Sequence, residues 1–213
     1  MASITAAVGT AIGTAVDTAV DTLPRMAGPH LGQSLRLWRT LRRVKQSHAG
    51  ELLGVSQATV SRWESGTLVP DGDEQAAIRQ LMQAGLDSAA DRELARLVNN
   101  SAGSVHLVCD LTHRLLALSA GRERDFGRPR ADVLGTSLWP YASDEIRTAE
   151  ATLADLGWFE PSPPALELTT RANRSSEVRI FASRFRWVRF QLSDGSFARL
   201  VDTIAYERPG PVA

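Results

Sequence analysis

The stretch GELLGVSQATVSRWESG, residues 50–66, constrains the fold more than any other part of the sequence. Gly54 can take the left-handed backbone conformation that ends a helix, and Ser56 can cap the N-terminus of the helix that follows. The pattern therefore predicts two short helices, over residues 46–53 and 57–65, that are joined by a tight turn. Two short helices joined in this way form a helix-turn-helix.

The helix predicted over residues 57–65 has one polar and one apolar face. Glutamine can bond adenine in two places, arginine can bond guanine in two, and small side chains let a helix enter the major groove of DNA. Gln57 and Arg62 can supply such contacts, whereas Val60 and Trp63 lie on the opposite face and are expected in the core. A solvated surface helix is the alternative, but the tight turn and the basic helix before it favour DNA.

The distribution of charge along the chain supports this interpretation. The formal net charge of the whole chain is zero, so a general affinity for polyanions is not indicated. Residues 31–69 hold six basic and two acidic side chains, a local net charge of +4. Residues 70–101 hold three basic and six acidic side chains, a local net charge of −3. The basic charge is thus concentrated around the predicted helix-turn-helix.

Residues 31 to about 85 resemble the five-helix DNA-binding domain of the Cro/C1 type, which defines the xenobiotic-response-element (XRE) family of bacterial and phage repressors. The resemblance rests on a combination of positions, namely Gln46, Gly50, Gly54-Val55-Ser56, Glu64 with Gly66, and Pro70. The sequence departs from the family at Gly50, where alanine is preferred, and at Ala58, where a longer side chain is common. The small Ala58 side chain suggests contact with a thymine methyl group.

The resemblance implies DNA contacts from seven residues. Bases would be read by Gln57, Ala58 and Arg62, and phosphate or mixed contacts would come from Gln46, Ser47, Thr59 and Ser61. Arg39 and Glu64 match an arginine and a glutamate that pair inside such domains, so we expect them to be structural. A single domain of this kind binds weakly, so we expect a homodimer that reads two half-sites on double-stranded DNA.

The chain from residue 104 onward shows the pattern of two strands, then short helices, then three strands. The predicted fold class is α+β, in which an N-terminal all-α five-helix domain precedes a PAS-like five-stranded antiparallel sheet with flanking helices. The expected segments are an arm or helix at 1–30, a helix-turn-helix domain at 31–86, a helical linker at 87–103, the sheet domain at 104–207 and a tail at 208–213.

The first part of this C-terminal segment, VHLVCDLTHRLLALSAGRERDFGRPRADVLGTSLWPYASDEI, resembles a PAS domain, with the phrase Val133-Leu134-Gly135 after the short helices. PAS domains sense small molecules, bind cofactors or dimerise, so the resemblance implies one of these roles. Aromatic walls suit organic ligands, and the residues expected to line a ligand pocket are Trp139, Tyr141, Phe181 and Trp187. The alternative is that such residues form the core of an ordinary domain.

We expect no cofactor and no metal. A light-sensing flavin domain of this type needs a cysteine in a helix of the middle segment, whereas Cys109 falls on the first strand. A haem-binding PAS domain usually offers a histidine from the helical segment, yet residues 114–213 contain none. His106 and His113 are expected as surface or packing residues. The histidines and the single cysteine also lack the paired spacing of a structural zinc site.

Enzymatic activity and catalytic residues are not expected either. A self-cleaving repressor needs a serine that is activated by a lysine, and the single lysine, Lys45, lies in the N-terminal half. The sequence also lacks the H-x-H pair of a cupin metal site and the nucleophile elbow of a Ser-His-Asp hydrolase.

Together these patterns predict a sequence-specific transcriptional regulator of bacterial type that binds DNA as a homodimer and responds to a small-molecule effector in its C-terminal domain. The alternative is a DNA-bound adaptor or an antitoxin whose C-terminal half binds a partner protein. One cysteine and the lack of about 18 consecutive apolar residues predict a cytoplasmic, nucleoid-associated protein without membrane contact. The repeat at residues 7–22 predicts a pairing helix or a mobile arm, without a function.

Overall fold

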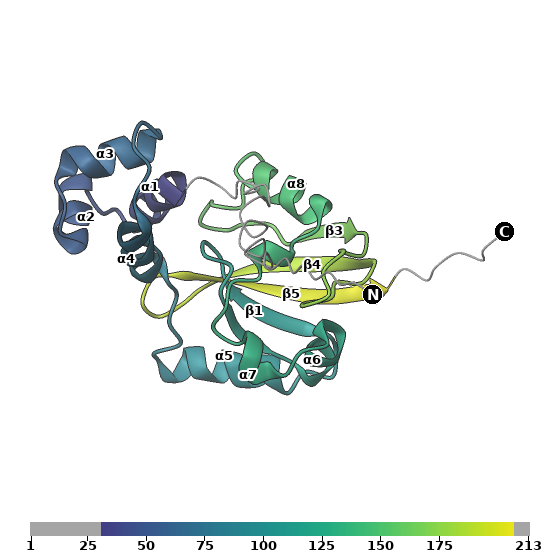
Figure 1. Cartoon of the computed structure of the whole chain (residues 1–213). Coiled ribbons are helices and arrows are strands. Elements are labelled where there is room, and N and C mark those ends of the chain that lie inside the picture. The colour runs from purple at the N-terminus through teal and green to yellow at the C-terminus, as the bar shows by residue number, and fades with distance from the viewer. Residues whose placement is uncertain (1–30, 207–213) are drawn as a thin grey trace, which may run out of the picture.

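The computed structural model describes residues 31–206, which form a helical N-terminal domain and a C-terminal domain built on one sheet (Figure 1). The predicted arm at 1–30, with its repeat, and the predicted tail at 208–213 lie outside the described residues. The predicted fold class is confirmed, since a helical region is followed by a five-stranded antiparallel sheet with helices.

Four helices form the N-terminal domain, whereas the sequence predicted five, and they are α1 (Leu31–Leu41), α2 (Gln46–Leu53), α3 (Gln57–Ser65) and α4 (Gly72–Met82). The next helix, Ala89–Asn99, packs against the C-terminal sheet instead. Their buried apolar side chains make one core, which includes Leu35 from α1 and Ile78 from α4. Val60 and Trp63 of α3 are buried in this core, as the apolar face of the predicted helix required.

The turn between α2 and α3 has the geometry that the sequence predicts. Gly54 ends α2 with a φ of 68°, and Gly66 ends α3 with a φ of 75°, both in the left-handed region that favours glycine. The Ser56 side chain accepts a hydrogen bond of 3.1 Å from the backbone N–H of Thr59 and so caps α3. These local signals place both helices at the predicted residues.

The helices α1 and α3 cross at Gly32, where a side chain does not fit. A Cβ atom at this position would collide with the backbone carbonyl of Trp63. The glycine therefore allows the backbone of α1 to approach the C-terminal turn of α3 closely and fixes the angle at which α3 is held.

The C-terminal sheet has five strands, which are β1 (Val105–Cys109), β2 (Leu115–Leu118), β3 (Leu166–Thr170), β4 (Ser183–Gln191) and β5 (Phe197–Tyr206). Their order is β2-β1-β5-β4-β3, and every neighbouring pair is antiparallel. The first and last segments of the domain therefore lie side by side in the centre of the sheet.

The strand β4 begins later than the alternation of residues in the sequence suggests. Residues 178–182 alternate like a strand, but β4 starts only at Ser183. The Asn173 side chain explains the difference, because its Nδ2 donates to the carbonyl of Val178 and its Oδ1 accepts from the N–H of Ile180, each at 2.9 Å. These side-chain bonds hold the segment in a loop.

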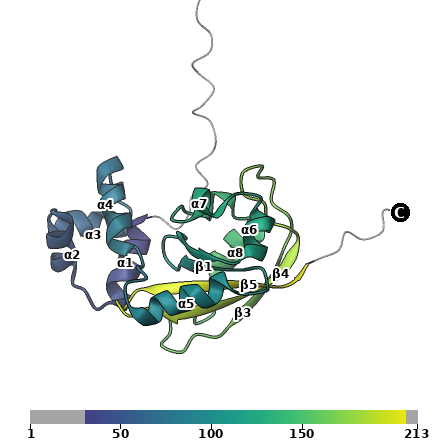
Figure 2. The same ribbon diagram turned by 90° about the horizontal axis from the view of Figure 1, so that it is seen from below.

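Helices cover the two faces of the sheet unequally (Figure 2). The helix α5 (Ala89–Asn99) packs against β1 and β2 through side chains such as Val98, on the face to which Val105, Leu107 and Cys109 point. The opposite face lies beneath four short elements, which are α6 (Ala120–Phe126), α7 (Arg130–Val133), η1 (Trp139–Tyr141) and α8 (Asp144–Thr152). All five residues of β1 are buried because both of its faces are covered.

The two domains touch where the turns of the sheet meet α1 and α4. Arg42, which directly follows α1, pairs with Asp194 in the β4–β5 turn, with 3.4 Å between Nη2 of Arg42 and a carboxylate oxygen of Asp194. Leu111, just after β1, packs against the core of the N-terminal domain. The turn between β1 and β2 is therefore in direct contact with the helical domain.

Replacing Gly32 by alanine is expected to lower the free energy of unfolding by about 1–3 kcal/mol, since the new Cβ atom forces α1 away from α3. Gly72→Ala is the matched control, because no atom lies within 4 Å of a Cβ at that position. Urea denaturation followed by circular dichroism measures both. Equal stability of the two variants would show that the close approach of α1 to α3 is not a constraint.

Candidate nucleic-acid interface and ligand cavity

The seven residues expected to contact DNA lie at the start of α2 and on one face of α3. Gln57, Ala58 and Arg62 are exposed on α3, and Ser47 is exposed on α2. The remaining three are partly buried, and they are Gln46, Thr59 and Ser61. Ala58, Ser61 and Arg62 lie on the side of α3 away from Val60 and Trp63, and Gln57 and Thr59 lie at the borders of that side. A hydrogen bond joins Gln57 to Gln46 of α2.

A chain of side-chain hydrogen bonds runs from the interior of the domain to the first residue of α3. Arg39 donates to both carboxylate oxygens of Glu64, at 2.8 and 2.9 Å. Gln46 donates to Glu64 at 2.9 Å, and Gln57 donates to Gln46 at 2.7 Å. Because each partner is held by the next, the Gln57 side chain is oriented before any ligand arrives. We call these four residues the Arg39–Gln57 chain.

The charge at the inner end of this chain is fixed. Burial raises the pKa of Glu64, but hydrogen bonds from Arg39 and Gln46 outweigh it and hold the pKa below its ordinary value. Arg39 also donates from Nη1 to the carbonyl of Val44, at 3.0 Å, which ties the turn before α2 to the same pair. Glu64 is therefore ionised at neutral pH, and the expected structural role of Arg39 and Glu64 is confirmed.

The other exposed side chains of α3 leave room for a partner. Arg62 donates from Nε to the carbonyl of Ala58, at 3.3 Å, and its side chain lies in solvent. A single long bond of this kind is readily exchanged for contacts to a base or a phosphate. The Ala58 methyl group lies next to it on the exposed face of the helix.

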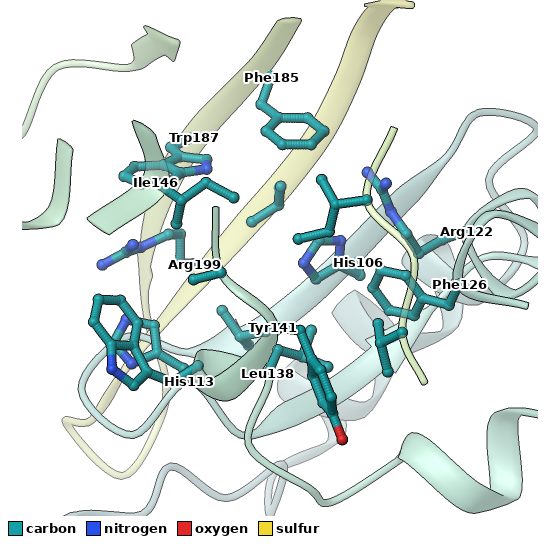
Figure 3. A pocket seen from close by; sticks show the side chains of 16 residues that line it. His106, His113, Arg122, Phe126, Leu138, Tyr141, Ile146, Phe185, Trp187 and Arg199 are labelled. Carbon is teal, nitrogen blue, oxygen red and sulfur yellow. The ribbon is translucent and has the colours of Figure 1, made fainter. Parts of the chain in front are cut away.

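A cavity of about 70 Å³, which we call the inner cavity, lies between the sheet and the elements that cover the face opposite α5 (Figure 3). Of the four aromatic residues expected to line a pocket, Trp139, Tyr141 and Trp187 do so. Phe181 does not, because it lies in the loop before β4, is 43% exposed and packs edge-on against Tyr206. The walls are mainly apolar, from Val108 on β1 to Val201 on β5.

Four polar residues of this cavity were not anticipated as lining residues, namely His106, His113, Arg122 and Arg199. His106, expected as a surface or packing residue, points inward because β1 alternates and its neighbours Val105 and Leu107 face α5. Burial, followed by the charges of Arg122 and Arg199, lowers the pKa of His106 well below its ordinary value. His106 is therefore uncharged at neutral pH.

One side of the cavity rests on a buried cluster of charged side chains. Asp110 is fully buried, and its carboxylate oxygens lie 2.8 Å from Arg189 Nε and 2.7 Å from an Arg199 guanidinium nitrogen. Arg199 also pairs with Glu150 of α8 at 2.6 Å, and His113 Nε2 lies 3.2 Å from the other oxygen of that carboxylate. We call these five residues the Asp110 cluster.

Two residues belong to the walls of two different spaces. His113 and Trp139, whose rings lie 4.7 Å apart, line the inner cavity. They also line a cleft of about 540 Å³ between the two domains, together with Trp63 and Gly66 at the C-terminal end of α3. A change in the position of the Trp139 ring therefore alters both the cavity and the surface that faces α3.

The Asp110 cluster makes stability depend on pH. Burial alone raises the pKa of Glu150, but the charge of Arg199 and the neighbouring His113 lower it to about 2. The pKa in the folded protein is below the ordinary value of 4.5, so this carboxylate stabilises the fold above about pH 4.5, and the contribution is lost as the pH falls toward 2.

In Glu150→Gln this pH-dependent contribution is absent. The difference in unfolding free energy between the wild type and the variant is expected to shrink by on the order of 3 kcal/mol between pH 4.5 and pH 2. Glu167→Gln, at an exposed position of β3, controls for the loss of one carboxyl group. Urea titrations over this range measure the effect, and parallel stability curves for wild type and Glu150→Gln would contradict it.

Two kinds of feature are absent from the described residues, a membrane-spanning helix and a metal-binding cluster. Between residues 31 and 206, no helix is long and apolar enough to cross a membrane. In the same range, no group of three or more histidine, cysteine, aspartate or glutamate residues is placed to hold a metal ion.

Comparison with known proteins gives a family match for the N-terminal part of the chain and structural similarities for the C-terminal part. The family model of a helix-turn-helix domain matches residues 30–97. A PAS domain from a two-component sensor histidine kinase is 15% identical, with a TM-score of 0.40, over 54% of this chain and 94% of that one. The PAS domain of an HTR-like protein from Haloarcula marismortui is also 15% identical, with a TM-score of 0.38, over 55% and 91%. The d2 variant of RsLOV is 17% identical, with a TM-score of 0.41, over 58% and 71%.

No curated protein matches the sequence. Residues 30–97 thus carry a helix-turn-helix domain, and the C-terminal part of the chain is similar in structure to PAS domains.

Proposed function

We propose that this protein is a sequence-specific transcriptional regulator of the XRE type, which reads operator half-sites with α3 as a homodimer. The observation that carries the proposal is the Arg39–Gln57 chain, which orients a glutamine at the N-terminus of an exposed helix. A side chain that reads a base loses less entropy on binding when its position is fixed in advance. A surface helix without a partner gains nothing from such a device.

The chemistry of the α3 surface fits the major groove. Gln57 offers the amide group that pairs with adenine, and Arg62 offers the guanidinium group that pairs with guanine. Ala58 lies between them and leaves space for a thymine methyl group. Ser47 and Thr59 are placed at the edges of this surface, where hydroxyl groups reach phosphates.

The dimer in this proposal follows from the small size of one reading helix. Two copies of α3 that are one turn of DNA apart, about 34 Å, read two half-sites and multiply the specificity of each. The C-terminal domain is the part of the chain that we assign to pairing and sensing. A regulator of this kind works in the cytoplasm, where we place it with the nucleoid.

The effector in this proposal is a small molecule in the inner cavity. An effector acts only if it binds the DNA-competent and DNA-incompetent forms unequally. The wall formed by His113 and Trp139 supplies a route for such a difference, because it borders both the cavity and the cleft next to Trp63 and Gly66. An occupant that shifts the Trp139 ring changes how the C-terminal domain supports α3.

The contribution of Arg62 to base reading is tested by Arg62→Ala. The variant is expected to lose about 1–3 kcal/mol of binding free energy on an operator obtained by selection, and to lose its preference at one base pair. Arg186→Ala removes an exposed arginine from β4 and serves as the control. Fluorescence anisotropy with the operator and with single-base variants measures both effects. An equal loss on every sequence would make Arg62 a phosphate contact.

A further inference from the structure

The inner cavity combines apolar walls with polar atoms that have no partner. Within the part of the chain that the structure describes, three buried side-chain nitrogens of lining residues accept or donate no hydrogen bond, namely His106 Nδ1, Trp139 Nε1 and Arg122 Nε. Unpaired buried polar atoms are costly, and a ligand that bonds to them recovers the cost.

Two of these nitrogens belong to residues on the same side of the cavity. Figure 3 shows His106 and Arg122 next to Phe126, while His113 lies at the far side. Arg122 is only 3% exposed and His106 only 8%. The polar group of a ligand that lies beside Phe126 would therefore meet both residues.

Arg122 is a buried cation whose ion pair with Asp125 is long. Its Nη2 donates to the carbonyl of Ser104 at 2.8 Å and to the Thr203 hydroxyl at 2.6 Å, which are both neutral acceptors. The nearest carboxylate oxygen, on Asp125, lies 3.6 Å from Nη1. Arg199, by contrast, has two carboxylates within 2.7 Å. A buried cation with so little compensation favours an anionic ligand group.

The surroundings of His106 point the same way. Burial is the main cause of the low pKa of His106, and the positive charges of Arg122 and Arg199 lower it further, so two cations act on this side of the cavity. The cations also stack on the walls, since Arg122 lies over the rings of Phe126 and Phe185 at 5.6 and 5.5 Å. The guanidinium group is thereby held in place beside the cavity.

We propose that the inner cavity binds a compact organic acid, with its carboxylate at Arg122 and His106 and its apolar part against Phe126, Phe185 and Trp187. The inference deepens the proposed function and rests on it for the role of effector. The volume of about 70 Å³ sets the size, because a dry cavity of about 150 Å³ holds a benzene molecule. Acids smaller than isobutyrate fit directly, whereas isobutyrate, which has as many non-hydrogen atoms as benzene, and a one-ring acid both require a shift of the Trp139 ring.

The test uses the full-length protein and two pairs of molecules, sodium isobutyrate with isobutyramide and sodium benzoate with benzamide. Each pair has nearly the same shape and differs in charge. Isothermal titration calorimetry without DNA is expected to give a Kd at least about tenfold lower for an acid than for its amide. Thermal unfolding is expected to show the same order, since a ligand of the folded state raises Tm.

Three variants connect the binding to this site. Arg122→Gln removes the charge, and Arg184→Gln on the exposed face of β4 is its matched control. Because Arg122 also holds Ser104 and Thr203, His106→Phe is the second variant, which keeps an aromatic ring beside Phe126. Ile146→Trp on α8 fills the cavity. His106→Phe and Ile146→Trp are each expected to raise the Kd of the acid at least about tenfold, and Arg184→Gln to leave it unchanged.

Several results would overturn the proposal. The first is equal Kd values for an acid and its amide, and the second is no binding of either acid. The third is a Kd of the acid for the Ile146→Trp variant equal to that for the wild type. The measurement involves no DNA, so it stands apart from the proposed function. If the protein binds the acid but selects no operator sequence, the proposed regulatory function is contradicted and the proposed ligand stands. If it selects an operator but binds no acid, the proposed ligand is contradicted and the regulatory function stands.

Discussion

The C-terminal domain depends on the pairing of one fully buried carboxylate, that of Asp110. A buried charge is tolerated only when opposite charges and hydrogen bonds surround it, and Arg189, Arg199 and the indole N–H of Trp158 supply them here. These partners come from β4, β5 and the segment after α8, so the cluster joins distant parts of the chain at the end of β1. Breaking such a pair typically costs about 3–5 kcal/mol.

The Asp110 cluster lies directly beside the turn between β1 and β2. Asp110 begins the turn that contains Leu111, which packs on the helical domain, and His113, which borders both the cavity and the interdomain cleft. The Asp110 cluster therefore forms the base of this turn. The helical domain has its own buried ion pair, between Arg39 and Glu64, which supports Gln57 in the same way.

Local signals made the helical domain predictable. The caps at Ser56, Gly54 and Gly66 and the apolar face of α3 each act within a few residues, so the helix bounds could be anticipated. The pairing of Arg39 with Glu64 was implied by the resemblance to Cro/C1-type domains. The DNA contacts stay a prediction, although the structure joins Gln57 to Gln46 and leaves Ala58 and Arg62 exposed.

The C-terminal domain was less predictable because its details depend on distant contacts. The segment 178–182 has the alternation of a strand, but the Asn173 side chain takes its backbone hydrogen bonds, and Phe181 is therefore outside the cavity. His106 could be assigned to the cavity only once α5 was known to cover the other face of β1. The polar lining from Arg122 and Arg199 likewise results from contacts between residues far apart in the sequence.

The central claim is that a pre-oriented α3 reads DNA sequence in pairs of half-sites. Selection of binding sites from a library of random double-stranded DNA by the purified full-length protein tests this claim most directly. The account predicts an enriched motif with two-fold symmetry, whose half-sites are separated by about one helical turn, 10–10.5 base pairs between centres. Recovery of DNA without any enriched motif would contradict it.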